Sequence, residues 1–235
     1  NNFYRDPQVR GELDFSGDVA AELETASEAV DDPAASLQAV LPGPYSLFDL
    51  ASDEHYGDES EFFGAIAEFL AGEVKAFPAH KTLTLHEPSL VENPPDEGAD
   101  ERASEAIDAV AAATDAEVVA HTYWGALEET VHAHLLDADV DAVGYDFVSD
   151  HERNLYNINE YGTKDDVALG LVDGQNTLVE DAETVAERVE WFESQIPLEG
   201  FDRTYLTPNT EVFYLPTNKY REKLNALAAA AEVLD

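Results

Sequence analysis

Short apolar runs alternate with longer amphipathic segments along most of the chain. Each run is apolar on both of its faces, which is typical of a parallel strand that is covered on both sides. The runs are LQAVL at 37–41, TLTLHEP at 82–88, EVVAHTYWG at 117–125, VDAVGYDFV at 140–148, DVALGLVDG at 166–174 and RTYLTPNTE at 203–211. We therefore expect a strand at each of these places.

The segments between the runs repeat apolar residues at the spacing of one helix face. We expect helices at about 19–29, 180–195 and 218–234, and one more between the first two strands. The residues predicted to face the core are Phe62, Ile66, Phe69, Leu70, Val74, Val185, Val189, Phe192, Leu224, Leu227 and Leu234. Strands that alternate with helices indicate an α/β protein with parallel strands.

Polar or ionisable residues stand at the carboxyl end of almost every predicted strand. They are His86 and Glu87, His121 and Tyr123, Asp146, Asp173, and Asn209 with Thr210. A doubly wound sheet and a closed barrel both satisfy the alternation, but convergence of many strand ends on one site is typical of the barrel. No glycine-rich G-x-G-x-x-G turn follows a strand, so dinucleotide binding has no support. The pattern favours a TIM-type (β/α)8 barrel with two of its units missing.

Composition supports a folded domain of unusual charge. The chain has 235 residues, 44 % of them hydrophobic, which is enough for one domain with its own core. It carries 51 acidic and only 12 basic residues, for a formal net charge of -39. Such self-repulsion is tolerated where high salt screens it, as in halophiles. Nucleic acid is an improbable partner, because little positive charge exists to neutralise phosphates.

The chain contains no Cys, so neither disulfides nor thiolate metal sites are available. It shows no apolar run long enough to span a membrane and no leader segment. We therefore expect a cytoplasmic protein.

Six segments taken in order resemble the cobalamin-independent methionine synthase family and its archaeal relatives. They are LPGPYSL, LTLHEPSL, VVAHTYWG, VGYDFV, LGLVDGQNTLVE and LTPNTEVFYLP, and the opening FYRDPQVRGEL resembles the stretch that precedes them. The order is similar to that of strands three to eight of the family's catalytic barrel. The resemblance implies a single barrel domain over 1–235, without the first two strand–helix units.

The family transfers a methyl group from a folate to the sulfur of homocysteine, which zinc activates by deprotonating the thiol. In the family, the zinc is held by a His, two Cys and a Glu. The resemblance places the His at His121 and the carboxylate at Asp146, which is shorter than Glu, while Tyr123 and Thr210 stand where the family has Cys. It therefore implies a degenerate zinc site.

The resemblance also implies substrate-binding positions at His86, Glu87, Asp173 and Tyr123. The family's Asp-Glu-Pro motif reads His86, Glu87 and Pro88 here, and a His cannot offer an ammonium a charged acceptor. Adjacent strand residues point to opposite faces, so at most one of His86 and Glu87 faces a barrel interior.

Each of these positions has a structural alternative. Because no Cys stands near it, His121 fits a core histidine better than a metal ligand. Asp146 and Asp173 are as compatible with buried carboxylates or helix caps as with a binding role. His132 and His134 lie two apart on a predicted helix, so they do not share a face. We interpret both as surface residues.

Three functions stay open. The chain is a methionine synthase-like methyltransferase that uses folate and homocysteine, or a zinc-free paralogue that binds folate or supports a separate catalytic chain. The third is a metal-free decarboxylase related to uroporphyrinogen decarboxylase, although the chain has few basic residues to bind the several carboxylates of such a substrate.

Overall fold

A computed structural model describes residues 7–196 and 200–234 of the chain. The first four residues of the opening segment that resembled the family, 3–6, lie outside the described residues. The chain divides into two compact units, which are described separately. The first unit comprises residues 1–120 and 137–140, and the second comprises 121–136 and 141–235.

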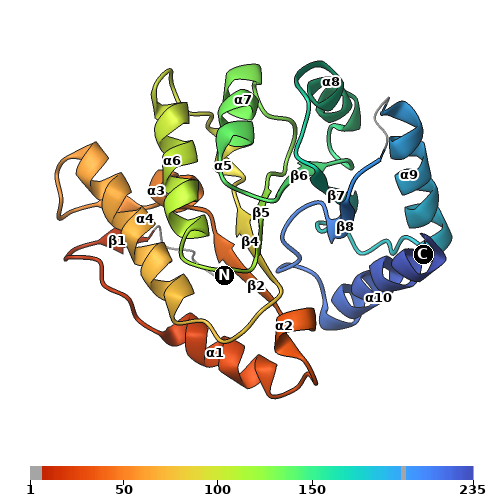
Figure 1. The fold of residues 1–235 in the computed structure, drawn as a ribbon, viewed down its shortest axis with the longest axis horizontal. Helices are drawn as coiled ribbons and strands as arrows, with labels where there is room; N and C mark the ends of the chain where they lie inside the picture. The colour runs from red at the N-terminus through yellow and green to blue at the C-terminus, as the bar shows by residue number, and fades with distance from the viewer. Residues whose placement is uncertain (1–6, 197–199, 235) are drawn as a thin grey trace. The chain divides into compact units, whose positions relative to one another are not determined.

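The first unit contains parallel strands and the helices that follow them (Figure 1). Its strands are β1 (Gln8–Val9), β2 (Gln38–Pro42), β3 (Ser52–Asp53), β4 (Thr82–His86) and β5 (Glu117–His121), the last residue of which belongs to the second unit. Its helices are α1 (Asp18–Ser27), α2 (Pro33–Ser36), α3 (Pro44–Leu50), α4 (Glu59–Lys75), α5 (Ser89–Glu92) and α6 (Ala99–Ala111). Strands β2 and β4 are paired in parallel, and so are β1 and β3. Helices α4 and α6 lie side by side.

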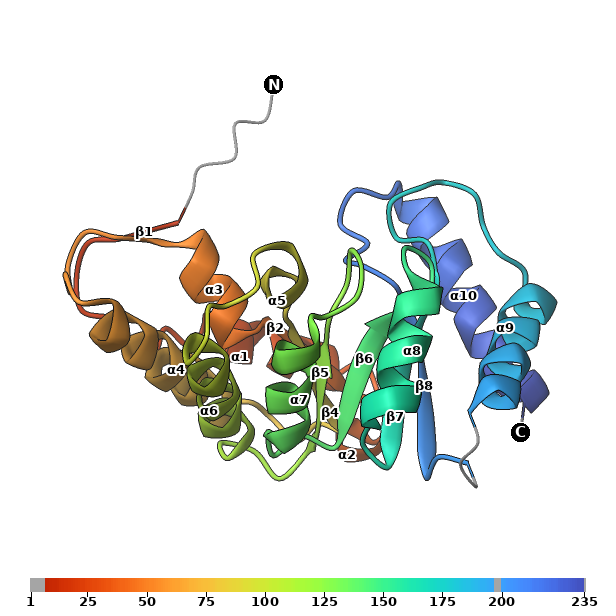
Figure 2. The same ribbon diagram turned by 90° about the horizontal axis from the view of Figure 1, so that it is seen from above.

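The second unit repeats the same alternation. Its strands are β6 (Ala142–Asp146), β7 (Asp166–Val172) and β8 (Arg203–Pro208), and its helices are α7 (Glu129–Asp137), α8 (His151–Tyr161), α9 (Ala182–Gln195) and α10 (Thr217–Leu234). The three strands are parallel, with β7 between the other two. Helices α9 and α10 lie side by side (Figure 2). The α/β class, the parallel strands and each predicted strand are confirmed.

Burial departs from the predicted pattern at two strands. Every residue of β7 is buried, but β2 alternates: Ala39 and Leu41 are buried, whereas Val40 is 50 % exposed. Strand β8 is not fully buried at any position. The expectation of two covered faces is therefore wrong for β2 and β8, because an apolar run does not reveal which of its faces a neighbour covers.

Two helix predictions need a similar correction. In α10 the buried stripe runs through Lys223, Leu227 and Ala230, so Leu234 at the helix end is exposed. His132 of α7 is fully buried, with Nε2 2.9 Å from the hydroxyl oxygen of Tyr145, and is not the surface residue expected. Burial lowers the pKa of His132 to about 4, so the ring is neutral at neutral pH.

No helix within 7–196 and 200–234 is both long and apolar enough to cross a membrane.

We expect salt to stabilise this fold, because the formal charge of -39 repels itself in dilute buffer. Raising KCl from about 0.15 M to about 1 M shortens the Debye length from roughly 8 Å to roughly 3 Å. The midpoint of thermal unfolding should then rise by about 5 °C or more, measured by circular dichroism. A midpoint that does not rise between these two KCl concentrations would contradict the electrostatic explanation.

Candidate functional site

The carboxylate of Asp146 connects several strand ends of the second unit. It stands at the last position of β6 and is completely buried. Its Oδ1 accepts hydrogen bonds from the backbone N–H groups of Val148 (2.9 Å) and Ser149 (2.8 Å), and its Oδ2 accepts one from the N–H of Trp124 (3.0 Å). The side-chain amide of Asn209 donates to both oxygens, at 3.0 and 3.2 Å. Both carboxylate oxygens are therefore committed to the protein.

The backbone turns sharply after β5, where Trp124 has a φ of 72°. A bulky residue in the left-handed region is strained, and such strain persists only where the surroundings enforce it. Here the bond from its N–H to Asp146 enforces it, and the Tyr123 ring packs edge-on against the indole at 5.0 Å. The Trp124 side chain is 39 % exposed while Tyr123 is buried. The strained turn thus presents one aromatic ring to solvent at a strand end.

His121 occupies the last position of β5 and is buried against β6 and β8. Its Nε2 lies 2.8 Å from the hydroxyl oxygen of Thr207, and its ring centre lies 6.2 Å from that of Tyr123. Gly144 makes room for this ring, since a Cβ there would lie 2.6 Å from His121 Cδ2. The arrangement is that of a packed core histidine.

Asp173 and Thr210 lie at the neighbouring strand ends. The Asp173 carboxylate accepts from the backbone of Gln175 at 2.8 Å and from the side chain of Asn176, so it closes its own loop. Thr210 donates its hydroxyl to the carbonyl of Glu211 at 3.1 Å. Neither side chain is among the hydrogen-bond partners of Asp146.

In the first unit, Glu87 caps a short helix. Its buried carboxylate accepts the backbone N–H groups of Tyr45 (3.0 Å) and Ser46 (2.7 Å), in the first turn of α3. Gly43 lies so close that a Cβ would come within 2.1 Å of the Glu87 carboxyl carbon. The turn formed by Pro42, Gly43 and Pro44, called the PGP turn below, therefore needs a glycine at 43, and Glu87 holds that turn in place.

His86 precedes Glu87 at the end of β4, where its backbone carbonyl accepts the N–H of Gly43 at 2.7 Å. Burial lowers the pKa of His86 to about 4, so its ring is neutral at neutral pH. A neutral ring carries no negative charge that could pair with an ammonium group.

These residues do not fit a zinc ion. Within residues 7–196 and 200–234, no group of three or more His, Cys, Asp or Glu side chains is placed to hold a metal. The sequence has no cysteine, and the oxygens of Asp146 already accept five hydrogen bonds. His121 and Asp146 thus act in hydrogen bonding and packing.

Comparison with known proteins decides what this scaffold is. Residues 1–197 match the family described as "Cobalamin-independent synthase, N-terminal domain". The chain belongs to the cobalamin-independent methionine synthase family. The family expected from the motifs is confirmed, and the matching part of it is the N-terminal domain rather than the catalytic barrel that the motifs suggested. The absence of both zinc-ligand cysteines is consistent with that difference.

Curated relatives carry the name 5-methyltetrahydropteroyltriglutamate–homocysteine methyltransferase. The protein of Bacillus mycoides is 25 % identical over 249 residues, covering 100 % of this chain and 32 % of the relative. The protein of Salinibacter ruber is 31 % identical over 142 residues, covering 59 % of this chain and 17 % of the relative. The chain spans about a third of the length of the first of these relatives.

Solved structures share the fold. A B12-independent methionine synthase from Shewanella sp. W3-18-1, in complex with selenomethionine, matches with a TM-score of 0.74 and 21 % identity, over 92 % of this chain and 66 % of that one. A putative vitamin-B12 independent methionine synthase from Listeria monocytogenes matches with a TM-score of 0.70 and 20 % identity. The match covers 96 % of this chain and 73 % of that one. At this identity, the likeness concerns the fold alone.

The structure divides the predicted site residues between the units. His86 and Glu87 lie in the first, whereas His121, Tyr123, Asp146, Asp173 and Thr210 lie in the second. The residues that sequence reasoning underrated are Trp124 and Asn209. The signal for Asn209 was its position at the end of β8, but nothing in the sequence marked Trp124 as a strained residue.

We expect Asp146→Asn to destabilise the protein by about 3 kcal/mol or more, because the new amide NH2 would face a buried N–H donor. Asp173→Asn is the matched control, since Asp173 is only partly buried and binds its own loop. It should cost less than about 1 kcal/mol. Urea unfolding in molar KCl measures both, and equal losses would contradict the central position of Asp146.

Glu87 should make stability depend on pH. Burial raises its pKa to about 7, although hydrogen bonds from Ser46 and Tyr45 lower it. The native state then binds more protons than the unfolded state between about pH 4.5 and 7. Protonation of Glu87 therefore stabilises the native state at low pH, and this contribution is lost as the pH rises. Across that window, the unfolding free energy of wild type should fall relative to that of Glu87→Gln by about 3 kcal/mol. A difference that stays constant from pH 4.5 to 7.5 would contradict the shift.

Proposed function

We propose that this chain is the N-terminal-domain component of a cobalamin-independent methionine synthase and that the zinc-bearing part lies outside residues 1–235. In this proposal the assembly transfers a methyl group from a folate to the sulfur of homocysteine. The chain alone binds and orients substrate and does not activate the thiol. The observation that carries the proposal is the match of 1–197 to the family's N-terminal domain.

The chemistry of the strand ends supports this division of labour. A free thiol has a pKa of ~8.5, so methyl transfer at neutral pH needs a metal that stabilises the thiolate. In the family, zinc belongs to the C-terminal domain. The strand ends of the second unit are instead held by hydrogen bonds to Asp146, which makes them a rigid platform. Binding and orientation are what such a platform supplies.

Within this platform, Trp124 is the best candidate to contact a folate. Its ring is partly exposed and its backbone is fixed, so little freedom is lost when a flat ring stacks on it. Tyr123 supports the indole from behind, and Asp173 stays a candidate at the next loop. His86 and Glu87 of the first unit remain candidates through the PGP turn that they hold.

The proposal includes the architecture. Residues 1–235 correspond to strands three to eight of a barrel, in one cytoplasmic domain, with a second methionine-synthase-like polypeptide segment as partner. The parallel strands of both units and the fold of the solved relatives support this interpretation.

A reconstitution assay tests the function. The chain is incubated in molar KCl with methyltetrahydrofolate and homocysteine, alone and with a zinc-loaded C-terminal-domain protein of the family. Methionine should form only in the mixture, and metal analysis should find zinc only in the added protein. Turnover by the chain alone, with one zinc per chain, would refute the proposal, as would a mixture no faster than the added protein by itself.

Trp124→Ala should weaken binding of methyltetrahydrofolate by about three- to tenfold, because an aromatic contact contributes about 0.5–1.5 kcal/mol. Isothermal titration in molar KCl measures the affinity. Tyr156→Ala is the control, since Tyr156 is an exposed aromatic residue on α8 of the same unit. Equal effects of the two substitutions would remove Trp124 from the folate site.

A further inference from the structure

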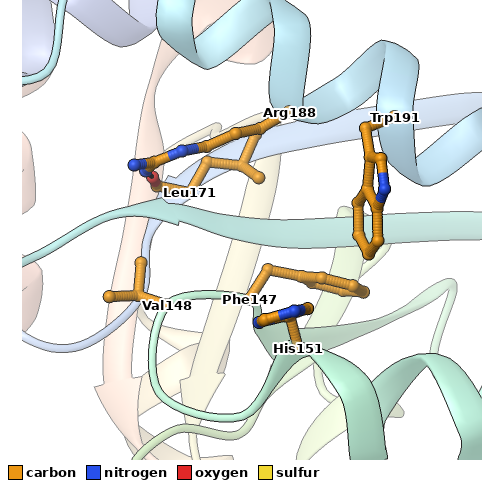
Figure 3. A pocket seen from close by; sticks show the side chains of 6 residues that line it. All are labelled: Phe147, Val148, His151, Leu171, Arg188 and Trp191. Carbon is orange, nitrogen blue, oxygen red and sulfur yellow. Dashed lines mark hydrogen bonds between the residues drawn. The ribbon is translucent and has the colours of Figure 1, made fainter.

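A cavity of about 340 Å³ opens on the second unit, next to the turn whose backbone N–H groups bind Asp146. It lies where the segment after β6 and the end of β7 meet the start of α8 and the middle of α9 (Figure 3). It is lined by Phe147, Val148, His151, Leu171, Arg188 and Trp191. Its volume falls in the range of pockets that hold small molecules.

Aromatic rings form much of its wall. Phe147 packs edge-on against the buried Phe192 at 5.0 Å, so its ring is held from behind. Trp191 extends from α9 toward Phe147 and packs edge-on against His151 at 5.6 Å, yet it remains 41 % exposed (Figure 3). An indole of this size left open beside a fixed phenyl ring offers faces for a flat ligand.

One cation completes the lining. The Arg188 guanidinium donates a hydrogen bond to the carbonyl of Leu171, which fixes its direction. In the part of the chain that the structure describes, Arg188 forms no ion pair, although acidic residues outnumber basic ones by 51 to 12. A guanidinium has five N–H donors, so several remain for another partner. Among the described residues that line the cavity, none has a carboxylate that could compete for them.

We propose that this cavity binds a small planar aromatic anion, with its ring against Phe147 and Trp191 and its anionic group on Arg188. The aromatic wall selects a flat apolar body, and the guanidinium selects a carboxylate, sulfonate or phosphate by paired hydrogen bonds. Since the protein as a whole repels anions, this local cation is what makes binding of an anion possible. This binding goes beyond the folate and homocysteine chemistry proposed above, which was not assigned to the residues Arg188 and Trp191.

Titration with 2-naphthoate in molar KCl tests the proposal, with neutral 2-naphthylmethanol as the matched probe. Calorimetry gives the affinities, and the indole N–H signal of Trp191 in an NMR spectrum reports the place of binding. We expect naphthoate to bind more tightly than the alcohol and to shift the Trp191 signal. No binding of naphthoate at millimolar concentration, or a shift confined to Trp124, would overturn the proposal.

Substitutions separate charge from packing. Arg188→Gln should weaken naphthoate binding by about tenfold and leave the affinity for the alcohol unchanged. Arg188→Lys should restore part of the preference for the anion. Arg153→Gln is the control, because Arg153 lies on α8 of the same unit but does not line the cavity. Trp191→Ala should weaken the binding of both probes. Equal naphthoate affinity in wild type and Arg188→Gln would refute the role of the cation.

Discussion

The buried carboxylate of Asp146 holds the strand ends of the second unit together. Its oxygens accept the backbone N–H groups of Val148 and Ser149 just after it, the N–H of Trp124 after β5, and the side-chain amide of Asn209 after β8. A buried carboxylate is tolerated only when hydrogen bonds satisfy it. The carboxylate of Asp146 therefore requires all of these donors to be in place. The strained turn at Trp124 and the position of Asn209 both follow from this one group.

The same interaction explains why these strand ends, in the part of the chain that the structure describes, do not fit a zinc ion. Both oxygens of Asp146 already accept main-chain and amide donors, so a metal would have to displace some of these hydrogen bonds. His121 is likewise occupied with Thr207 and packed over Gly144. The polar residues at these strand ends hold one another in place, which is the rigidity that the proposed role in positioning substrate requires.

Glu87 plays a comparable part in the first unit. It satisfies the N–H groups at the start of α3 and packs where any side chain at position 43 would have to go. In both units, a carboxylate at a strand end organises a turn beside it. The net charge of -39 acts in a different way, through self-repulsion and its screening by salt.

The order of strands and helices, the α/β class and the family could all be predicted from the sequence, because apolar periodicity and local motifs depend on residues close together in the chain. The hydrogen-bond partners of Asp146 could not, since Asn209 lies 63 positions away and only parallel pairing brings the two strand ends together. Burial of His132 and exposure of Val40 depend on which neighbour covers each face, and periodicity does not contain that information. The cavity beside Arg188 is likewise a product of tertiary structure, because its walls come from two helices and from the segments at two strand ends, which only packing brings together.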